Sequence, residues 1–189
     1  LERFDFDLAY FYMEVDDEVT SVSSVGNRSF FRNADTERQG VEAALVIDVV
    51  DGLQVTTAYT YSDFTFDSFL TSPASVGNNL PGIPKHQGYA EIAYTHSSGA
   101  YAVWDIIRVG RFYGNNANTV NAGRHTVANL RFGQDFQVGK TTIGPFVGVN
   151  NLFDEEYFAN VRLNAFGGRA FEPAPDRNFY GGVSFRMTF

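Results

Sequence analysis

The sequence predicts an all-β protein, namely an antiparallel, transmembrane β-barrel segment of about eight strands. Most of the chain alternates apolar and polar residues, and the alternating segments are joined in turn by short and long connections. Signals for amphipathic helices are almost absent. Successive side chains of a strand point to opposite faces, so each segment would carry one apolar and one polar face.

The first four segments alternate in this way. In residues 3–13, Phe4, Phe6, Leu8, Tyr10 and Tyr12 oppose Asp5 and Asp7; in residues 40–49, Val41, Ala43, Leu45, Ile47 and Val49 oppose Glu42 and Asp48; in residues 53–62, Leu53, Val55, Tyr59 and Tyr61 oppose Gln54, Thr56, Thr60 and Ser62; in residues 88–96, Ala90, Ile92 and Tyr94 oppose Glu91 and Thr95. Each of these segments is therefore predicted to be a strand.

The other four segments follow the same pattern, with one interruption. Residues 101–113 form a long segment whose alternation is broken around Asp105. In residues 126–136, Ala128, Leu130 and Phe132 oppose Asn129, Arg131 and Asp135; in residues 142–150, Ile143, Val147 and Val149 form one face; in residues 179–189, Phe179, Val183, Phe185, Met187 and Phe189 oppose Tyr180, Ser184, Arg186 and Thr188. The alternation is clearest in the last segment, whose apolar face ends on Phe189.

The connections alternate in length. Residues 50–52, 97–99 and 137–140 are tight turns that contain Gly, whereas residues 15–33, 67–85, 114–124 and 154–176 are long. Outer-membrane barrels have short periplasmic turns and longer extracellular loops. The C-terminus is then expected at the short-turn, periplasmic side.

Composition excludes several classes of site. The chain has no Cys, and it carries 14 Lys and Arg against 22 Asp and Glu, a net charge of -8, which argues against nucleic-acid binding. No H-x-x-x-H spacing surrounds His86, His96 or His125, and a G-x-S-x-G elbow is missing. We therefore predict no catalytic site, cofactor or metal.

A soluble β-sandwich or a lipocalin-like barrel would show a similar alternation, with the apolar faces turned inward. Segments of ten or more residues exceed the common strand length of about 5–6 and favour a membrane span. On this interpretation the polar faces line a wet lumen, because their charged residues would be costly in lipid: Asp5, Asp7, Glu42, Asp48, Glu91 and Arg131.

Five stretches of the chain together resemble one protein family. They are VNNLFDEEY at 149–157, PAPDRNF at 173–179, NLPGIPKH at 79–86, GRFYGNNANT at 110–119 and TERQGVE at 36–42. Taken in the order in which they occur along the chain, and over nearly its whole length, they are similar to motifs of TonB-dependent outer-membrane receptors. One departure is Asp176, where Gly is commoner in the family.

The resemblance implies a barrel of about 22 strands with a plugged lumen. Residues 1–189 would be the C-terminal third of that barrel, with the plug domain and the segment that engages TonB absent from this chain. The implied function is TonB-dependent uptake of a scarce nutrient, chiefly a ferric siderophore, across the bacterial outer membrane. A small eight-stranded anchor barrel and a barrel hydrolase are the alternatives.

The resemblance also implies partners and one signal. The partners would be the lipid bilayer and lipopolysaccharide, the barrel assembly machinery, the plug domain and remaining strands, TonB through the missing N-terminal part, and a small-molecule ligand at the outer loops. Val183, Phe185, Met187 and Phe189 would form an assembly signal, since they resemble the terminal aromatic pattern that the assembly machinery recognises.

Overall fold

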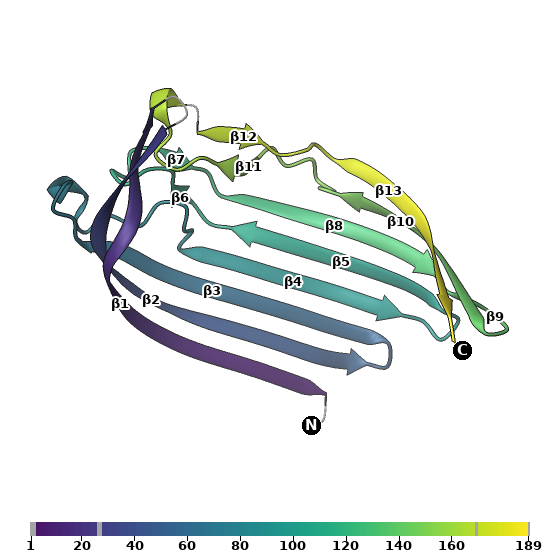
Figure 1. Cartoon of the computed structure of the whole chain (residues 1–189). Helices are drawn as coiled ribbons and strands as arrows, with labels where there is room; N and C mark the ends of the chain where they lie inside the picture. Colours follow the sequence, from purple (N-terminus) through teal and green to yellow (C-terminus); the bar gives the residue numbers. More distant parts are fainter. Residues whose placement is uncertain (1–2, 26–27, 169, 189) are drawn as a thin grey trace.

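The computed structural model describes residues 3–25, 28–168 and 170–188. Its main element is a nine-stranded antiparallel sheet in the order β1-β2-β3-β4-β5-β8-β10-β13, with β9 also paired to β10 (Figure 1). The strands are β1 (Phe4–Val25), β2 (Arg28–Val50), β3 (Leu53–Ser68), β4 (His86–Thr95), β5 (Ala100–Val109), β8 (His125–Gln134), β9 (Phe136–Val138), β10 (Thr141–Asn150) and β13 (Asn178–Met187).

Short elements lie in the long connections. Strands β6 (Phe112–Tyr113) and β7 (Asn121–Ala122) pair with each other, as do β11 (Phe158–Val161) and β12 (Phe171–Pro173). The described residues also contain two single turns of 3-10 helix, η1 (Pro73–Ser75) and η2 (Phe166–Gly168). No helix in the three described ranges is long and apolar enough to cross a membrane. The prediction of an all-β antiparallel sheet is confirmed.

The predicted tight turns are also confirmed, and one of them depends on its glycine. Gly52, between β2 and β3, has a φ of +80°. A Cβ atom there would lie 2.2 Å from the carbonyl oxygen of Thr95. Any other residue would therefore both strain the backbone and displace the neighbouring strand.

The interpretation of residues 15–33 as a long loop is wrong. Strands β1 and β2 stay paired as far as Val25 and Arg28, so this region is the far end of a long hairpin. Register shifts occur between Val15 and Glu18 and between Ser21 and Ser23. Each bulge places an extra residue on one strand and changes the phase of the side chains, which hid the strand from a search for strict alternation.

The single long segment predicted over residues 101–113 is also incorrect. Strand β5 ends at Val109, and Phe112 and Tyr113 belong to β6 in a separate small sheet. Strand β5 continues through Asp105. The alternation is hidden there because β5 carries apolar residues on both faces, and Val103 and Ile107 flank Asp105 on the same face. The chain leaves the main sheet at Gly110.

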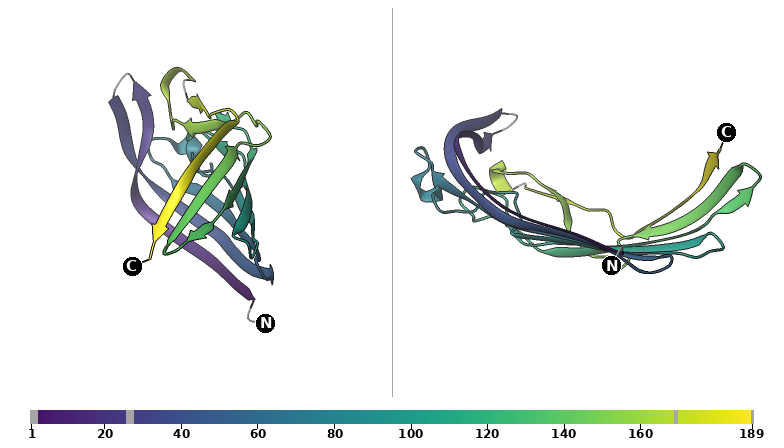
Figure 2. Two further views of the ribbon diagram at one scale, coloured as in Figure 1. Left: turned by 90° about the vertical axis from the view of Figure 1, so that its right-hand side faces the viewer. Right: turned by 90° about the horizontal axis from the view of Figure 1, so that it is seen from below.

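The register assembles one continuous apolar face. Leu45 of β2, for example, lies between Phe6 of β1 and Thr57 of β3, and Thr57 is followed by Ala90, Ile106 and Ala128 across the next strands. We call this surface the apolar face; its large members include Phe4, Phe6, Leu8, Tyr10, Leu45, Ile47, Tyr59, Ile92, Trp104, Leu130, Phe132, Val147, Phe179, Val183, Phe185 and Met187. No other element of the described chain packs over it (Figure 2), and Phe185 is 72% exposed. An uncovered apolar surface of this extent suits contact with lipid.

The opposite surface, the polar face, holds all six charged residues that were predicted to avoid lipid. Across neighbouring strands, Asp5 lies in one row of paired residues with Val46, Thr56, Glu91, Asp105 and Asn129. Asp48 lies in another such row with Gln54, Ala93, Val103, Arg131 and Gly148. Tyr89 Oη donates to Glu91 Oε2 (2.7 Å), and Asn129 Nδ2 donates to Asp105 Oδ2 (2.7 Å). The carboxylates of Glu91 and Asp105 thus have donors beside them on this face.

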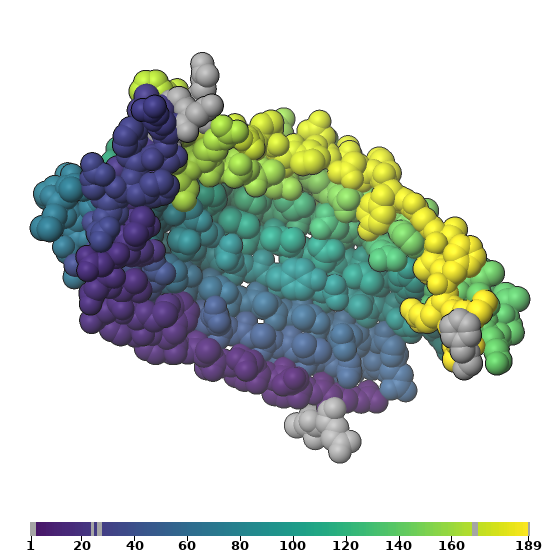
Figure 3. All heavy atoms as spheres, viewed as in Figure 1, coloured from purple at the N-terminus to yellow at the C-terminus, as the bar shows by residue number. Residues whose placement is uncertain are grey.

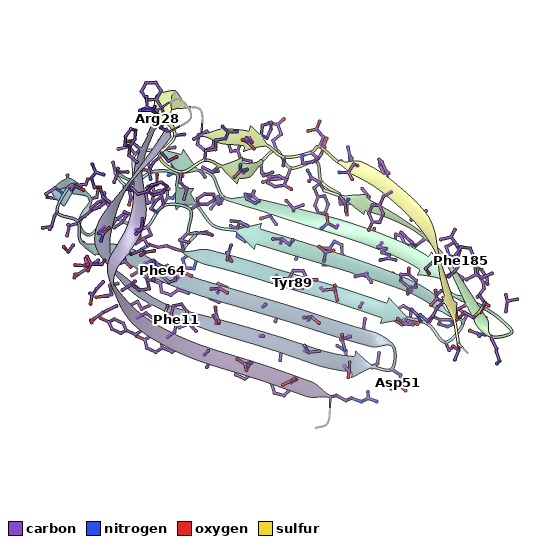
Figure 4. All side chains as sticks on the ribbon, in the orientation of Figure 1. Phe11, Arg28, Asp51, Phe64, Tyr89 and Phe185 are labelled. Atoms are coloured by element: carbon purple, nitrogen blue, oxygen red, sulfur yellow. The ribbon has the colours of Figure 1, made fainter. Side chains whose placement is uncertain are left out.

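Aromatic rings on the polar face cover glycines of neighbouring strands. The ring of Phe11 lies over Gly40, where a Cβ atom would be 2.5 Å from it, and meets Phe64 edge to face at a centroid distance of 6.0 Å (Figure 4). Arg131 is stacked on Phe146, with Cζ 4.2 Å from the ring centroid. The polar face therefore combines ionic groups with flat aromatic walls.

The sheet bends into an open trough with the β1–β2 hairpin and the other long connections curling to its concave side (Figure 2). Loop residues Leu80 and Pro81 line a hollow together with Arg38 and Phe64 of the polar face, so the polar face is the concave one. Figure 3 shows this concave surface uncovered between β1 and β13. Strands β1 and β13 do not pair with each other in the described residues, so the sheet is a partial barrel.

We expect Arg to be costly on the apolar face of β13 and tolerated on its polar face. Val183→Arg should lower the free energy of unfolding by about 2–4 kcal/mol if the site is near the bilayer midplane, and Ser184→Arg by much less. Reversible unfolding in bilayers of the full polypeptide measures both. Equal costs at the two positions would contradict the assignment of the faces.

Candidate ligand-binding loops

The long connections and the end of the β1–β2 hairpin gather at one end of the trough, away from the tight turns and both termini (Figure 1). Their base contains the largest fully buried side chains, Phe66 and Phe69, each 1% exposed. These rings lie 5.2 Å apart and pack with Ala34, Val22 and Leu80. The described core is therefore located under the loops rather than within the open sheet.

Two of the family-like motifs bind each other directly. Asn118 Oδ1 accepts a hydrogen bond from the backbone N–H of Asn79, and Asn118 Nδ2 donates to the carbonyl oxygen of Asn79, both at 2.9 Å. Asn115 Oδ1 accepts from the backbone N–H groups of Thr119 and Val120, which folds its own loop. The GRFYGNNANT stretch thus fixes the position of NLPGIPKH.

A second pair of motifs meets at the base of the loop 154–176. Asp154 Oδ1 accepts from the backbone N–H of Arg177 at 2.8 Å, and Arg177 Nη1 donates to the carbonyl oxygen of Leu152. Asn151, 3% exposed, accepts from the N–H of Glu155 and donates to its carbonyl oxygen. These contacts hold the two ends of the loop together.

Three asparagines from different connections form what we call the asparagine cluster: Asn78, Asn116 and Asn164. Asn116 Nδ2 and Asn164 Nδ2 both donate to the carbonyl oxygen of Ser21, at 2.9 and 2.8 Å. Asn164 Nδ2 also donates to Asn116 Oδ1 (3.0 Å), and Asn78 Nδ2 donates to the carbonyl oxygen of Asn116 (2.9 Å). The cluster therefore links three loops to the hairpin.

A hollow of about 330 Å³ opens beside this cluster on the polar face. Its walls are Glu18, Thr20, Ser21, Arg38, Phe64, Phe66, Leu80, Pro81, Ile83, Leu163 and Asn164. Glu18 and Arg38 form an ion pair, Thr36 donates to the same carboxylate, and the guanidinium lies 5.7 Å from the Phe64 ring centroid. The hollow offers apolar contact together with charged and hydroxyl groups, as small-molecule sites do.

The residues singled out in the sequence are distributed between the two ends of the trough. His86 lies 2.7 Å from Tyr59 Oη on the apolar face, His125 stacks on Tyr157, and His96 lies beside Ser98 at a tight turn. Val183, Phe185 and Met187 belong to the apolar face of β13, while Phe189 lies outside the described residues. Within the described ranges, no group of three or more His, Cys, Asp or Glu residues is placed to hold a metal ion.

Arg38, Glu18 and the asparagines were not singled out as site residues in the sequence. Asn79, Asn116 and Asn118 did stand inside recognised motifs, as did Arg38 in TERQGVE, and this was the available signal. Glu18 gave none, because its pairing with Arg38 depends on the hairpin that the bulges concealed.

One carboxyl in the loop 154–176 has a shifted pKa. Hydrogen bonds from Asn160 Nδ2 (3.1 Å) and Arg162 Nε (2.8 Å), together with the Arg162 charge, lower the pKa of Glu172 from its ordinary value of 4.5. Ionised Glu172 therefore stabilises the β11–β12 pair above this ordinary pKa, and that stabilisation is lost as the pH falls through the lowered pKa.

We expect this dependence in hydrogen exchange of the Arg162 amide, which donates to the carbonyl of Ala170. The parent protein should protect this amide better than a Glu172→Gln variant at about pH 6, and the difference should disappear as the pH falls below 4.5 and through the lowered pKa of Glu172. Comparison with the variant cancels the intrinsic pH dependence of exchange. A difference that stays constant over this range would contradict the role of the carboxylate.

Comparison with known proteins agrees with this arrangement. Residues 1–152 match the family model "TonB dependent receptor-like, beta-barrel". A ferrichrome outer membrane transporter/phage receptor of Escherichia coli K12 is 30% identical over 146 residues, which is 74% of this chain and 19% of that protein. A ferrioxamine B receptor of Salmonella typhimurium is 27% identical over 128 residues, 65% of this chain and 18% of that protein. The chain thus spans about a fifth of the length of these relatives.

Solved structures show the same fold. The unliganded ferric citrate transporter FecA superposes with a TM-score of 0.80 at 16% identity, covering 97% of this chain and 29% of that one. The ferric preacinetobactin receptor BauA of Acinetobacter baumannii gives 0.78 at 17% identity, covering 98% and 27%. Together with the match of the family model over residues 1–152, this shows that the chain belongs to the TonB-dependent receptor β-barrel family of the bacterial outer membrane.

Proposed function

We propose that this chain is the C-terminal part of the barrel of a receptor that takes up a ferric siderophore with energy delivered through TonB. The relatives named for ferrichrome and ferrioxamine B support this class of ligand. The barrel of about 22 strands, the plug domain and the contact with TonB belong to the same proposal.

The hollow at the loop end of the polar face is the observation that carries the proposal. It lies where an external ligand would first reach the lumen side, and it combines the Arg38 guanidinium with the Phe64 and Phe66 rings. A ferric chelate presents oxygen atoms around the metal, since hard cations are bound by oxygen. A guanidinium supplies planar N–H donors for such oxygens, and the rings supply apolar contact.

The two faces and two edges of the sheet define the other proposed partners. The apolar face contacts the bilayer and lipopolysaccharide, and the polar face packs on the plug domain. In hydrocarbon the outer edges of β1 and β13 would leave backbone groups without hydrogen bonds. We propose that neighbouring strands of the complete barrel pair with these two edges.

Assembly in the membrane adds one more proposed role. Val183, Phe185, Met187 and Phe189 would be recognised by the barrel assembly machinery, with the first three on the apolar face of β13. The outer edge of β13 supports this role, because an unpaired edge can add a strand from a partner.

The two alternatives have less support. A self-contained eight-stranded anchor needs β1 to pair with β13, and these strands do not pair in the described residues. A barrel hydrolase needs a Ser, His and acid together, whereas the contact of His96 with Ser98 links residues only two apart in an exposed turn. The family and its relatives are receptors and transporters, and we propose that this chain likewise has no catalytic role.

Binding of ferrichrome and ferrioxamine B to the full receptor tests the proposed ligand class. We expect one of them to bind, and Arg38→Gln to weaken that binding by at least about tenfold, because a charged donor to the ligand is lost. Glu18→Gln is the matched control: it removes the same ion pair but keeps the guanidinium. Isothermal titration calorimetry measures all three proteins.

Loss of affinity in both variants would assign the effect to the ion pair rather than to a ligand contact. If neither complex bound the parent receptor, the proposed ligand class would be wrong.

The proposed orientation places the loop cluster outside the cell. Single Cys residues at the exposed positions Ala74, Ala117 and Phe166 should react with an impermeant thiol reagent on intact cells. Cys at the exposed positions Ser98 and Lys140, at the tight turns, should react only after the outer membrane is opened. The chain has no Cys of its own, so each label is unique in this part of the receptor. Reaction of the second pair alone would invert the topology.

A further inference from the structure

We propose that Asn116 and Asn164 are positioning residues that join the β1–β2 hairpin and the outer loops into one unit before any ligand arrives. The joined unit would form a preassembled wall of the ligand hollow. The role of the joined unit as a wall of the ligand hollow rests on the proposed function, whereas the joining of the loops does not.

The contacts that carry the inference connect segments far apart in the sequence. Ser21 is 95 residues from Asn116 and 143 from Asn164, yet its carbonyl oxygen accepts from both side chains. Asn164 Oδ1 accepts from the backbone N–H of Asn116 at 3.0 Å, so these two loops are bonded in both directions. Asn78 and the reciprocal pair of Asn79 and Asn118 add the loop 67–85. Release of one segment therefore exposes polar groups in the others.

The burial of Asn116 raises the free-energy cost of losing these hydrogen bonds. Asn116 is only 7% exposed, so a lost partner would leave a polar group with little access to water. A donor or acceptor left unpaired in such a place costs more than a hydrogen bond exposed to solvent. The end of the hairpin also needs support, because in the described part of the chain β1 pairs only with β2, and an isolated two-stranded ribbon is marginal in water.

Asparagine is the residue type that this arrangement needs. Asn164 and Asn118 have φ angles of +52° and +55°, in the left-handed region that Asn tolerates better than most residues. The carboxamide supplies two N–H donors and an acceptor from one short side chain. Asn164 uses all three functions, towards Ser21, Asn116 Oδ1 and the Asn116 amide.

The cluster also forms a wall shared by two hollows. Asn164 and Ser21 line the hollow over Arg38, while Asn164 and Asn116 line a second one of about 560 Å³ that opens beside Arg32 and Ser72. A wall held by direct hydrogen bonds in the free protein does not have to be ordered when the ligand binds. Such preorganisation raises affinity by reducing the entropy cost of binding.

Asn164→Asp in the full receptor is the decisive variant. Aspartate keeps the shape, the tolerance of positive φ and the acceptor for the Asn116 amide, but it removes both donated bonds and places a carboxylate against the Ser21 oxygen. Hydrogen exchange without ligand should become about tenfold faster in three segments together, namely residues 18–23, 78–79 and 114–119. Residues 97–99, at the opposite end of the trough, should be unchanged and report intact folding.

Asn160→Ser is the matched control, because Asn160 lies in the same loop as Asn164 but its side chain donates to Glu172 and not to the asparagine cluster. It should leave exchange in all three segments unchanged. The double variant Asn116→Ala/Asn164→Asp should be no worse than Asn164→Asp alone, since residues that act as one unit are not additive. Faster exchange confined to residues 154–176, or additive effects, would overturn the joining of the loops.

The positioning role has a separate readout. Asn164→Asp should weaken binding of ferrichrome or ferrioxamine B by about tenfold, mainly through slower association, because the wall must now order on binding. Unchanged affinity despite faster exchange would overturn this role. Failure of the parent receptor to bind either complex would overturn the proposed function, and the exchange experiment would still decide whether the loops form one unit.

Discussion

Hydrocarbon offers the peptide backbone no hydrogen-bond partner, so each N–H and C=O in the bilayer must be satisfied by the protein itself. The antiparallel ladder from β1 to β13 meets this requirement for its internal strands. The same ladder fixes the register, and the register decides which side chains share a surface. A shift of one residue in any strand would exchange its apolar and polar side chains.

The polar face shows how charged residues are accommodated on one side of the sheet. Carboxylates at Glu91 and Asp105 lie directly opposite each other, and each accepts from a neutral donor on the same face. Arg131 is held between Tyr101 and Phe146 rather than by an opposing acid. Rings such as Phe11 lie over glycines of the neighbouring strand, so part of this face is aromatic rather than charged. These features explain why the face is polar without being a free row of charges.

The loops are organised differently from the sheet. Their order comes from side-chain amides and carboxylates that bond the backbone of other connections, as Asn118 does with Asn79 and Asp154 with Arg177. Several of these residues sit at positive φ, including Asp154 at +57° and Asn151 at +54°. Four of the five motifs that resemble the family in sequence, all except TERQGVE in β2, are therefore the points where the loops are hydrogen-bonded to one another.

The sequence by itself determined the sheet and its two faces, because alternation with a period of two is a local property that survives in any register. It also located the tight turns, since residues such as Gly52 must be glycine there. The extension of the first hairpin through residues 15–33 was decided only in the tertiary structure, where two bulges break the phase while backbone pairing continues. The Glu18–Arg38 pair and the convergence of Ser21, Asn116 and Asn164 were decided there as well. Those contacts depend on how the curved sheet brings distant loops together, and local side-chain order carries no record of that geometry.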